Sequence, residues 1–116
     1  MTQSPLGEST KVFALSIMRI CDEIRRNRHE PVLTAQLLRP GTAIGANVRT
    51  AAFAETRDEF VGKLHIALKE CAECEYWLEL LLESSYYTDP EPLNKCREIK
   101  NMLLASVNTA KNGREK

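Results

Sequence analysis

The chain has 116 residues, and its 16 Lys and Arg balance its 16 Asp and Glu, so the formal net charge is zero. This length fits one domain with a single core, and an apolar fraction of 43% is typical of a globular protein. The neutral total lacks the basic excess typical of proteins that bind duplex nucleic acid, and no apolar run approaches the roughly 20 residues of a membrane span.

Residues 1–8 are polar and are predicted to form a flexible N-terminal tail. Because this start lacks the basic and apolar regions of a signal peptide, we expect a cytoplasmic protein whose four cysteines are free thiols. Ser9 or Thr10 is the expected cap of a first helix. Apolar residues then recur at spacings of three and four over residues 12–24, which predicts one buried helical face that ends near Asn27–His29.

A second helix is predicted from about residue 32 to residue 54, with a bend at Pro40. Gly41 and Gly45 are four residues apart and share a face. Each glycine costs a helix about 1 kcal/mol relative to Ala, so we expect the close approach of a neighbouring backbone to offset this cost. The spacing predicts a buried seam of Leu37, Gly41, Ile44, Val48 and Ala51.

A third helix is predicted over about residues 57–85. Thr56 and Glu59 have the spacing of a capping box, an apolar stripe follows, and Glu residues occupy the opposite face. A fourth helix is predicted to start at Asp89-Pro90 and to end at Asn112-Gly113.

Four helices with short links predict an all-α protein, an antiparallel up-and-down four-helix bundle over residues 9–112, followed by a flexible tail at 113–116. The charge is unevenly distributed. It is +3 over residues 1–54, −5 over residues 55–88 and +2 over residues 89–116. This pattern suggests polar pairing between helices or between subunits, and solvated faces are the alternative.

No catalytic constellation stands out, so we expect a protein that is not an enzyme and has no small-molecule substrate, cofactor or metal. Cys71 and Cys74 have CxxC spacing, but both fall on the apolar stripe inside a helix, and no second ligand pair has a matching spacing. They are predicted to be core residues. His65 lacks the partner motif of a di-metal bundle. The Gly41-x-x-x-Gly45 segment lacks the GK[ST] sequence of a phosphate loop.

Adjacent aromatics on a helix point about 100° apart, so only one of Tyr76 and Trp77 can face the core of the subunit. The other is expected to face a second surface, which indicates oligomerisation. The residues predicted to take part in the oligomer interface or in tight helix packing are Gly41, Gly45, Asn47, Tyr76 and Trp77.

Five arginines outside the acidic segment are candidate contacts to RNA or DNA phosphates: Arg25, Arg26, Arg28, Arg39 and Arg49. Under this hypothesis they form a basic patch near one end of the bundle. The alternative is a solvated face or salt bridges to the third helix.

The chain resembles the bacterial four-helix bundle family, also called the 23S ribosomal RNA intervening-sequence protein family, over about residues 12–105. The resemblance rests on Gln36-Leu37-Leu38-Arg39, Ile44-Gly45-Ala46-Asn47, Phe60, Lys63-Leu64, Ala67, Glu70 and Glu75-Tyr76-Trp77-Leu78. The chain differs from many relatives at Pro40 and at Val48-Arg49-Thr50, and neither difference affects the expected fold.

The resemblance implies an up-and-down bundle that assembles as a homopentamer and has no known catalytic residues. Some family members are encoded inside insertions in ribosomal RNA genes. A related branch, the accessory variability protein of diversity-generating retroelements, is a basic pentamer that binds nucleic acid and the reverse transcriptase. The leading hypothesis is therefore a non-enzymatic, self-assembling helical bundle, and the alternative is a nucleic-acid-binding accessory protein. The neutral charge argues against the strongly basic branch.

Overall fold

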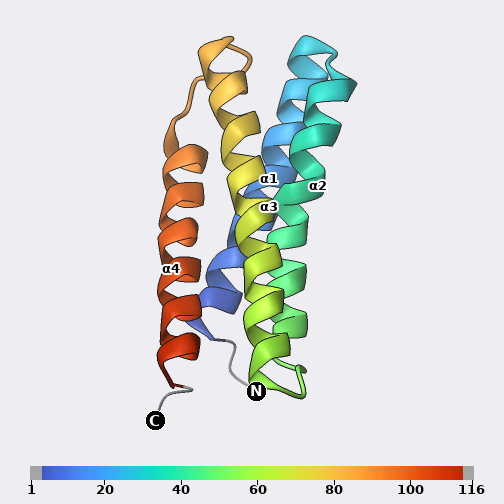
Figure 1. Ribbon diagram of the computed structural model, residues 1–116. Coiled ribbons are helices and arrows are strands. Elements are labelled where there is room, and N and C mark those ends of the chain that lie inside the picture. Colours follow the sequence, from blue (N-terminus) through green and yellow to red (C-terminus); the bar gives the residue numbers. More distant parts are fainter. Residues whose placement is uncertain (1–3, 114–116) are drawn as a thin grey trace.

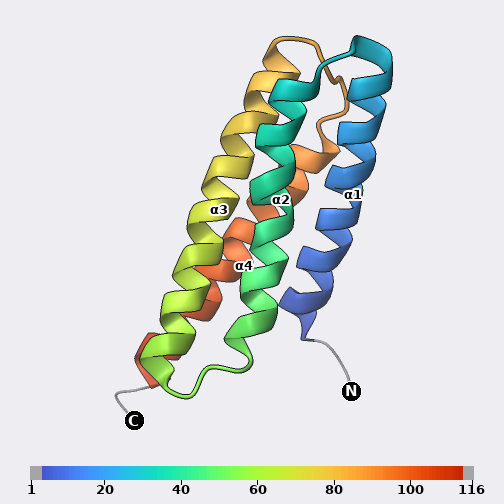
Figure 2. The ribbon, with the colours of Figure 1, turned by 90° about the vertical axis from the view of Figure 1, so that its right-hand side faces the viewer.

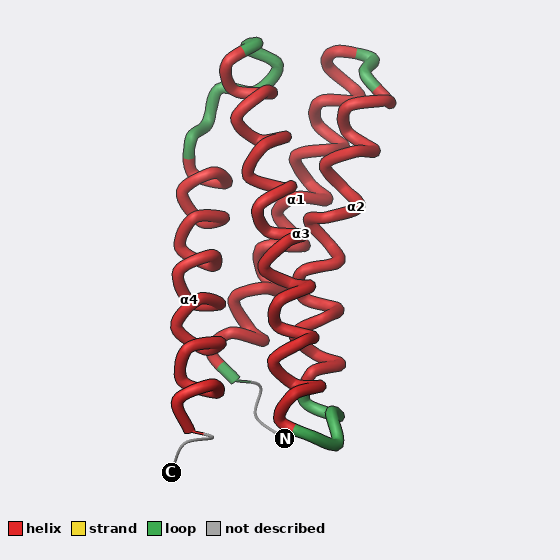
Figure 3. The backbone as a smooth tube through the Cα atoms, in the orientation of Figure 1, coloured by secondary structure: helices red, strands yellow, loops and turns green. Residues whose placement is uncertain are grey.

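The computed structural model describes residues 4–113, and within this range it contains four helices and no strand. The helices are α1 (Pro5–Arg28), α2 (Pro31–Ala51), α3 (Arg57–Glu83) and α4 (Glu91–Gly113). They alternate in direction and lie side by side in a rod of 52 × 26 × 21 Å (Figures 1 and 2). Only short loops connect them (Figure 3), in agreement with the short links from which the up-and-down bundle was predicted.

The first helix begins earlier than predicted. The Ser4 hydroxyl accepts a hydrogen bond from the Gly7 backbone N–H at 3.0 Å, and Pro5 occupies the first helical position, where its missing N–H is not needed. The predicted cap residue Thr10 is instead buried inside α1, and its hydroxyl donates to a backbone carbonyl one turn earlier. Of the predicted tail at residues 1–8, the last four residues are therefore helical, and the first three lie outside the described residues.

The turn between α1 and α2 matches the predicted position. His29 adopts a left-handed conformation with φ 53° and ends α1, and the Glu30 carboxylate accepts a hydrogen bond from a backbone N–H in the first turn of α2. Pro31 lies in that first turn, where its missing N–H is not needed. The helix is continuous through Pro40, whose ring is fully buried, and it ends at Ala51, three residues before the predicted end.

The capping box of α3 forms in a modified way. The Glu59 backbone N–H donates to the Thr56 hydroxyl at 3.1 Å, while the Glu59 carboxylate accepts from the backbone N–H of Glu55 at 3.4 Å. The first backbone N–H of α4 donates to the Asp89 carboxylate at 3.0 Å. The predicted tail at residues 113–116 lies outside the described residues, except for its first residue, which ends α4.

All four helices supply the core, and the predicted seam of α2 is confirmed. The side chains of Leu37 and Ile44 are fully buried, and the remaining seam residues are buried as well. Helices that follow one another in sequence pack closely, and α1 and α4 are also neighbours but contact each other less. The helices α1 and α3 are diagonal to one another. Among the described residues, no helix is both long enough and apolar enough to cross a membrane.

Of the two interpretations of the uneven charge, polar pairing between helices describes the ion pairs that α3 makes. Arg39 of α2 lies 3.1 Å from the Glu70 carboxylate of α3. On the other side of α3, Glu75 accepts from both Arg97 and Lys100 of α4, each at 2.9 Å. The acidic segment is therefore joined to both basic segments within one subunit.

Candidate functional site

Three of the five candidate arginines gather at the end of the bundle where α1 finishes. The Arg25 guanidinium donates to the buried Thr34 hydroxyl at 2.7 Å. Arg26 pairs with Asp22 one turn earlier at 2.9 Å, and both side chains are about two-thirds exposed. Arg28 donates to a carbonyl in the loop after α3, and its guanidinium lies 4.4 Å from the centre of a tyrosine ring in that loop.

The other two arginines are elsewhere, so the five do not form one patch. Arg39 lies midway along α2, where Glu70 and Glu73 of α3 hold its guanidinium. The hydrogen bond from Arg39 lowers the pKa of the Glu73 carboxyl, and a second hydrogen bond from Trp77 adds to this effect. Arg49 lies near the end of α2, at the opposite end of the bundle from the C-terminus of α1. Arg39 therefore matches the alternative interpretation, in which these arginines form salt bridges to the third helix.

The two predicted glycines pack α2 against α1 within the subunit. A Cβ atom added at Gly41 would lie 2.7 Å from the Ile17 side chain, and one added at Gly45 would lie 3.3 Å from the Thr10 hydroxyl. The tight helix packing expected of these glycines is therefore an internal contact. Asn47 is half-buried, and its side-chain amide donates to a backbone carbonyl one turn earlier on α2.

The adjacent aromatics separate as their spacing requires. Trp77 is partly buried against the core, and its indole N–H donates to Glu73 at 3.2 Å. Tyr76 remains 54% exposed, and its ring meets the Trp77 ring edge-on with 5.3 Å between centroids. Tyr76 is thus the aromatic that faces away from the core of the bundle.

Tyr76 is one of three large apolar side chains exposed on the outer face of α3, a face that also carries Lys69 and Glu73. The apolar spacing of the sequence did not single out this face. Ile66 is 45% exposed and Leu80 is 37% exposed, at positions that share the face of Tyr76. Gly62 lies on the same face, where no atom would lie within 4 Å of an added Cβ. The face opposite the buried stripe is therefore not filled by Glu alone. We call the surface formed by Gly62, Ile66, Tyr76 and Leu80 the α3 outer strip.

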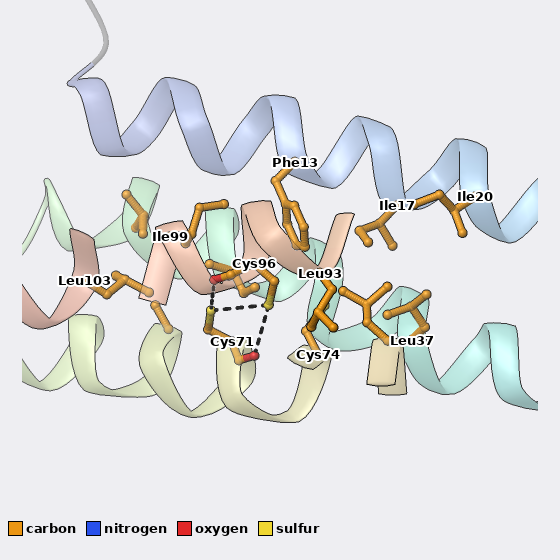
Figure 4. Close-up of a cluster of buried hydrophobic side chains, with 14 of the residues drawn as sticks. Phe13, Ile17, Ile20, Leu37, Cys71, Cys74, Leu93, Cys96, Ile99 and Leu103 are labelled. Carbon is orange, nitrogen blue, oxygen red and sulfur yellow. Dashed lines mark hydrogen bonds between the residues drawn. The ribbon is translucent and has the colours of Figure 1, made fainter. Parts of the chain in front are cut away.

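The cysteines lie in the core, as predicted. Figure 4 shows Cys71 and Cys96 facing each other between α3 and α4, with 3.7 Å between their sulfur atoms. A hydrogen bond with Cys96 and burial both raise the pKa of the Cys71 thiol, and burial raises the pKa of Cys21 to about 11. Such thiols are protonated and weak nucleophiles. Within the described residues, no group of three or more His, Cys, Asp or Glu side chains is arranged to hold a metal ion.

The comparisons with known proteins agree with this fold. The family model described as 23S rRNA-intervening sequence protein matches residues 7–105. A crystal structure of a protein with unknown function, from the S23 ribosomal protein family of Bacteroides thetaiotaomicron, shares 38% sequence identity with a TM-score of 0.86. The similarity covers 88% of this chain and 97% of that one. No curated protein matches the sequence. The chain therefore belongs to the 23S rRNA-intervening sequence protein family.

Proposed function

We propose that this protein is a non-enzymatic helical scaffold of the cytoplasm that assembles as a homopentamer through the α3 outer strip. The observation that carries this proposal is the exposure of Ile66, Tyr76 and Leu80 on one helical face. Aromatic side chains such as that of Tyr76 are enriched at protein interfaces, and Ile66 and Leu80 supply apolar area on the same face. Gly62 adds a flat position at which a second backbone can approach closely.

A ring requires two different complementary surfaces on each subunit, because its contacts run head to tail. The second surface is supplied by α1, whose Leu15 and Met18 are 47% and 51% exposed. Since α1 and α3 are diagonal in the bundle, their outer faces lie on opposite sides of the subunit. Their charges are also complementary, because α1 has five basic and three acidic residues while α3 has three and seven.

Size-exclusion chromatography with light scattering tests the assembly. Five copies of the 13.1 kDa chain have a mass of about 65 kDa. The double variant Ile66→Glu/Leu80→Glu is expected to elute as a monomer that retains its helical circular dichroism. Leu15→Glu/Met18→Glu should have the same effect from the other surface. Leu104→Glu is the matched control, because Leu104 is 42% exposed on α4 and lies outside both surfaces. A native protein of 13 kDa at micromolar concentration would contradict the proposal.

A second candidate function is nucleic-acid binding at the end of the bundle where Arg25, Arg26 and Arg28 gather. The Arg26–Asp22 pair is well exposed, and such surface pairs stabilise a helix by only about 0.3–0.5 kcal/mol, so a phosphate can replace the carboxylate. In a ring, this group of arginines would be repeated in every subunit.

Binding to labelled single-stranded RNA at several salt concentrations tests this candidate function. The triple variant Arg25→Ala/Arg26→Ala/Arg28→Ala should weaken binding and reduce the salt dependence. The matched control is Lys11→Ala/Lys69→Ala/Lys111→Ala, which removes three exposed cations from other parts of the surface. Equal losses in both variants, or no binding at low salt, would exclude this candidate.

A further inference from the structure

A groove of about 590 Å³ runs between α1 and α4, the two neighbouring helices that contact each other least. On α1 it extends from Glu8 to Glu23, a distance of about 22 Å at 1.5 Å per residue. On the other side it is lined by the loop before α4 and by α4 as far as Met102. The groove is long enough for about four turns of a helix.

The floor of this groove is apolar. Phe13 and Ile20 of α1 and Ile99 of α4 form its base and are almost completely buried. Two further apolar lining residues are accessible, because Val12 is 52% exposed and Met102 is half-buried. An occupant of the groove can therefore bury apolar side chains against the floor.

The rims of the groove are acidic, although the whole chain is neutral. Its two lining cations are Arg19 and Lys95, and Lys95 already lies 3.6 Å from the carboxylate of Glu98. Glu23 and Asp89 approach Tyr87 at one end, where burial first and then these two carboxylates raise the pKa of the phenol. Five carboxylates line the groove: Glu8, Glu23, Asp89, Glu91 and Glu98. The lining thus has an excess of three negative charges.

We propose that the groove between α1 and α4 binds a basic amphipathic helix of a partner protein. The apolar face of that helix would lie on the floor, and its Lys and Arg side chains would reach the carboxylates on both rims. A polyamine would satisfy the rims but leave the floor uncovered, and the rims repel nucleic acid.

The α3 outer strip of a second copy is a poor occupant of the groove on electrostatic grounds, because it belongs to a helix with seven acidic and three basic residues. Placing that helix between acidic rims would bring like charges together, which disfavours association. The groove and the α3 outer strip are therefore assigned to different partners.

A model peptide tests the proposal. The probe is a fluorescein-labelled 18-residue helix of Leu and Lys with one apolar face, followed by fluorescence anisotropy on the full-length protein at low salt. We expect saturable binding with a micromolar Kd, and no binding of the corresponding Leu and Glu peptide. The double variant Glu23→Gln/Glu91→Gln should weaken binding at least tenfold. The control Glu55→Gln/Glu83→Gln removes the same charge from exposed positions outside the groove and should change the Kd less than twofold.

Three results would overturn the proposal. Equal weakening in both double variants would show attraction to the overall field of the protein rather than to the groove. Competition by spermidine at the same concentration as the peptide would show that the apolar floor contributes nothing. The third result is an apparent Kd of the native protein for the peptide that rises with total protein concentration, while the Kd of the Ile66→Glu/Leu80→Glu variant stays constant. This result would show that a second copy of the chain competes with the peptide for the groove.

Discussion

At the scale of single residues, Gly41 and Gly45 differ in how much space they leave. A methyl group at Gly41 would be 2.7 Å from Ile17, which is fully buried and cannot move aside, whereas one at Gly45 would be 3.3 Å from Thr10. Gly41→Ala should therefore lower the free energy of unfolding by about 1–2 kcal/mol, because overpacking outweighs the gain in helix propensity. Urea unfolding followed by circular dichroism measures this change.

The Gly45→Ala variant is the matched comparison. Its contact needs a shift of only a few tenths of an ångström, and the gain in helix propensity of about 1 kcal/mol offsets that cost. We expect its stability to remain within about 0.5 kcal/mol of the native value. If Gly41→Ala proved the more stable of the two variants, this result would contradict the close packing of Ile17 against Gly41.

Trp77 shows how a single hydrogen bond can position a surface residue. Its indole N–H donates to Glu73, which is held in turn by Arg39 of the neighbouring helix. The indole is therefore fixed at the margin of the α3 outer strip, where it makes an edge contact with the exposed Tyr76 ring. A ring that is already ordered loses less conformational entropy when a partner covers it.

At the scale of helices, Glu75 joins α3 to α4. Hydrogen bonds from Lys100 and then Arg97 lower the pKa of its carboxyl in the folded protein below the ordinary 4.5. The bonds therefore stabilise the fold fully above the unfolded pKa, and this contribution is lost as pH falls through the lower folded pKa. We expect Glu75→Gln to cost about 1 kcal/mol at pH 7, and we expect this cost to shrink as the pH falls through the lowered pKa of the folded carboxyl, measured by urea unfolding.

Glu83→Gln is the control for this pH dependence, because Glu83 is exposed at the end of α3. Its free energy of unfolding should follow the native protein across the same pH range. A Glu75→Gln deficit that persisted unchanged in acid would indicate lost packing rather than lost charge pairing.

Much of the helical arrangement could be predicted from the sequence, because apolar spacing and caps are local signals. The start of α1 was missed even though Ser4-Pro5 has the pattern of a cap followed by a first-turn proline; the polar composition of the segment outweighed that signal. The five arginines do not form the single patch of the nucleic-acid hypothesis, and the reason is geometric. Once the chain reverses at His29, Arg49 lies about 27 Å along α2 from the turn, far from Arg28.

The α3 outer strip was harder to predict, because α3 is apolar on more than one face. Ile66 and Leu80 are separated by charged residues and do not interrupt the buried stripe, so only the packed bundle shows which apolar residues remain exposed. The spacing of Tyr76 and Trp77 was the one local signal for that surface. It correctly required one aromatic to face outward, without revealing the apolar neighbours along the helix.

At the scale of the whole molecule, a net charge of zero conceals a strong separation of charge. Ion pairs with Arg39, Arg97 and Lys100 of neighbouring helices neutralise part of the acidic excess of α3. The arginines at the end of α1 adjoin one end of the groove, where Glu23 and Asp89 line it, and the other groove carboxylates lie farther along α1 and α4. Total charge therefore says little about which partners such a bundle can bind, because each surface presents its own sign.

Assembly of the subunit also has a thermodynamic signature. If only folded chains associate, unfolding is coupled to dissociation, so the melting temperature must rise with protein concentration even for a very tight oligomer. For a pentamer of chains of this length, the enthalpy of unfolding predicts a rise of roughly 5 °C per tenfold increase in concentration. Differential scanning calorimetry over a hundredfold range measures it. The Ile66→Glu/Leu80→Glu variant should show no such rise, whereas Leu104→Glu should retain it. A native melting temperature that did not depend on concentration would mean that the α3 outer strip remains exposed to water.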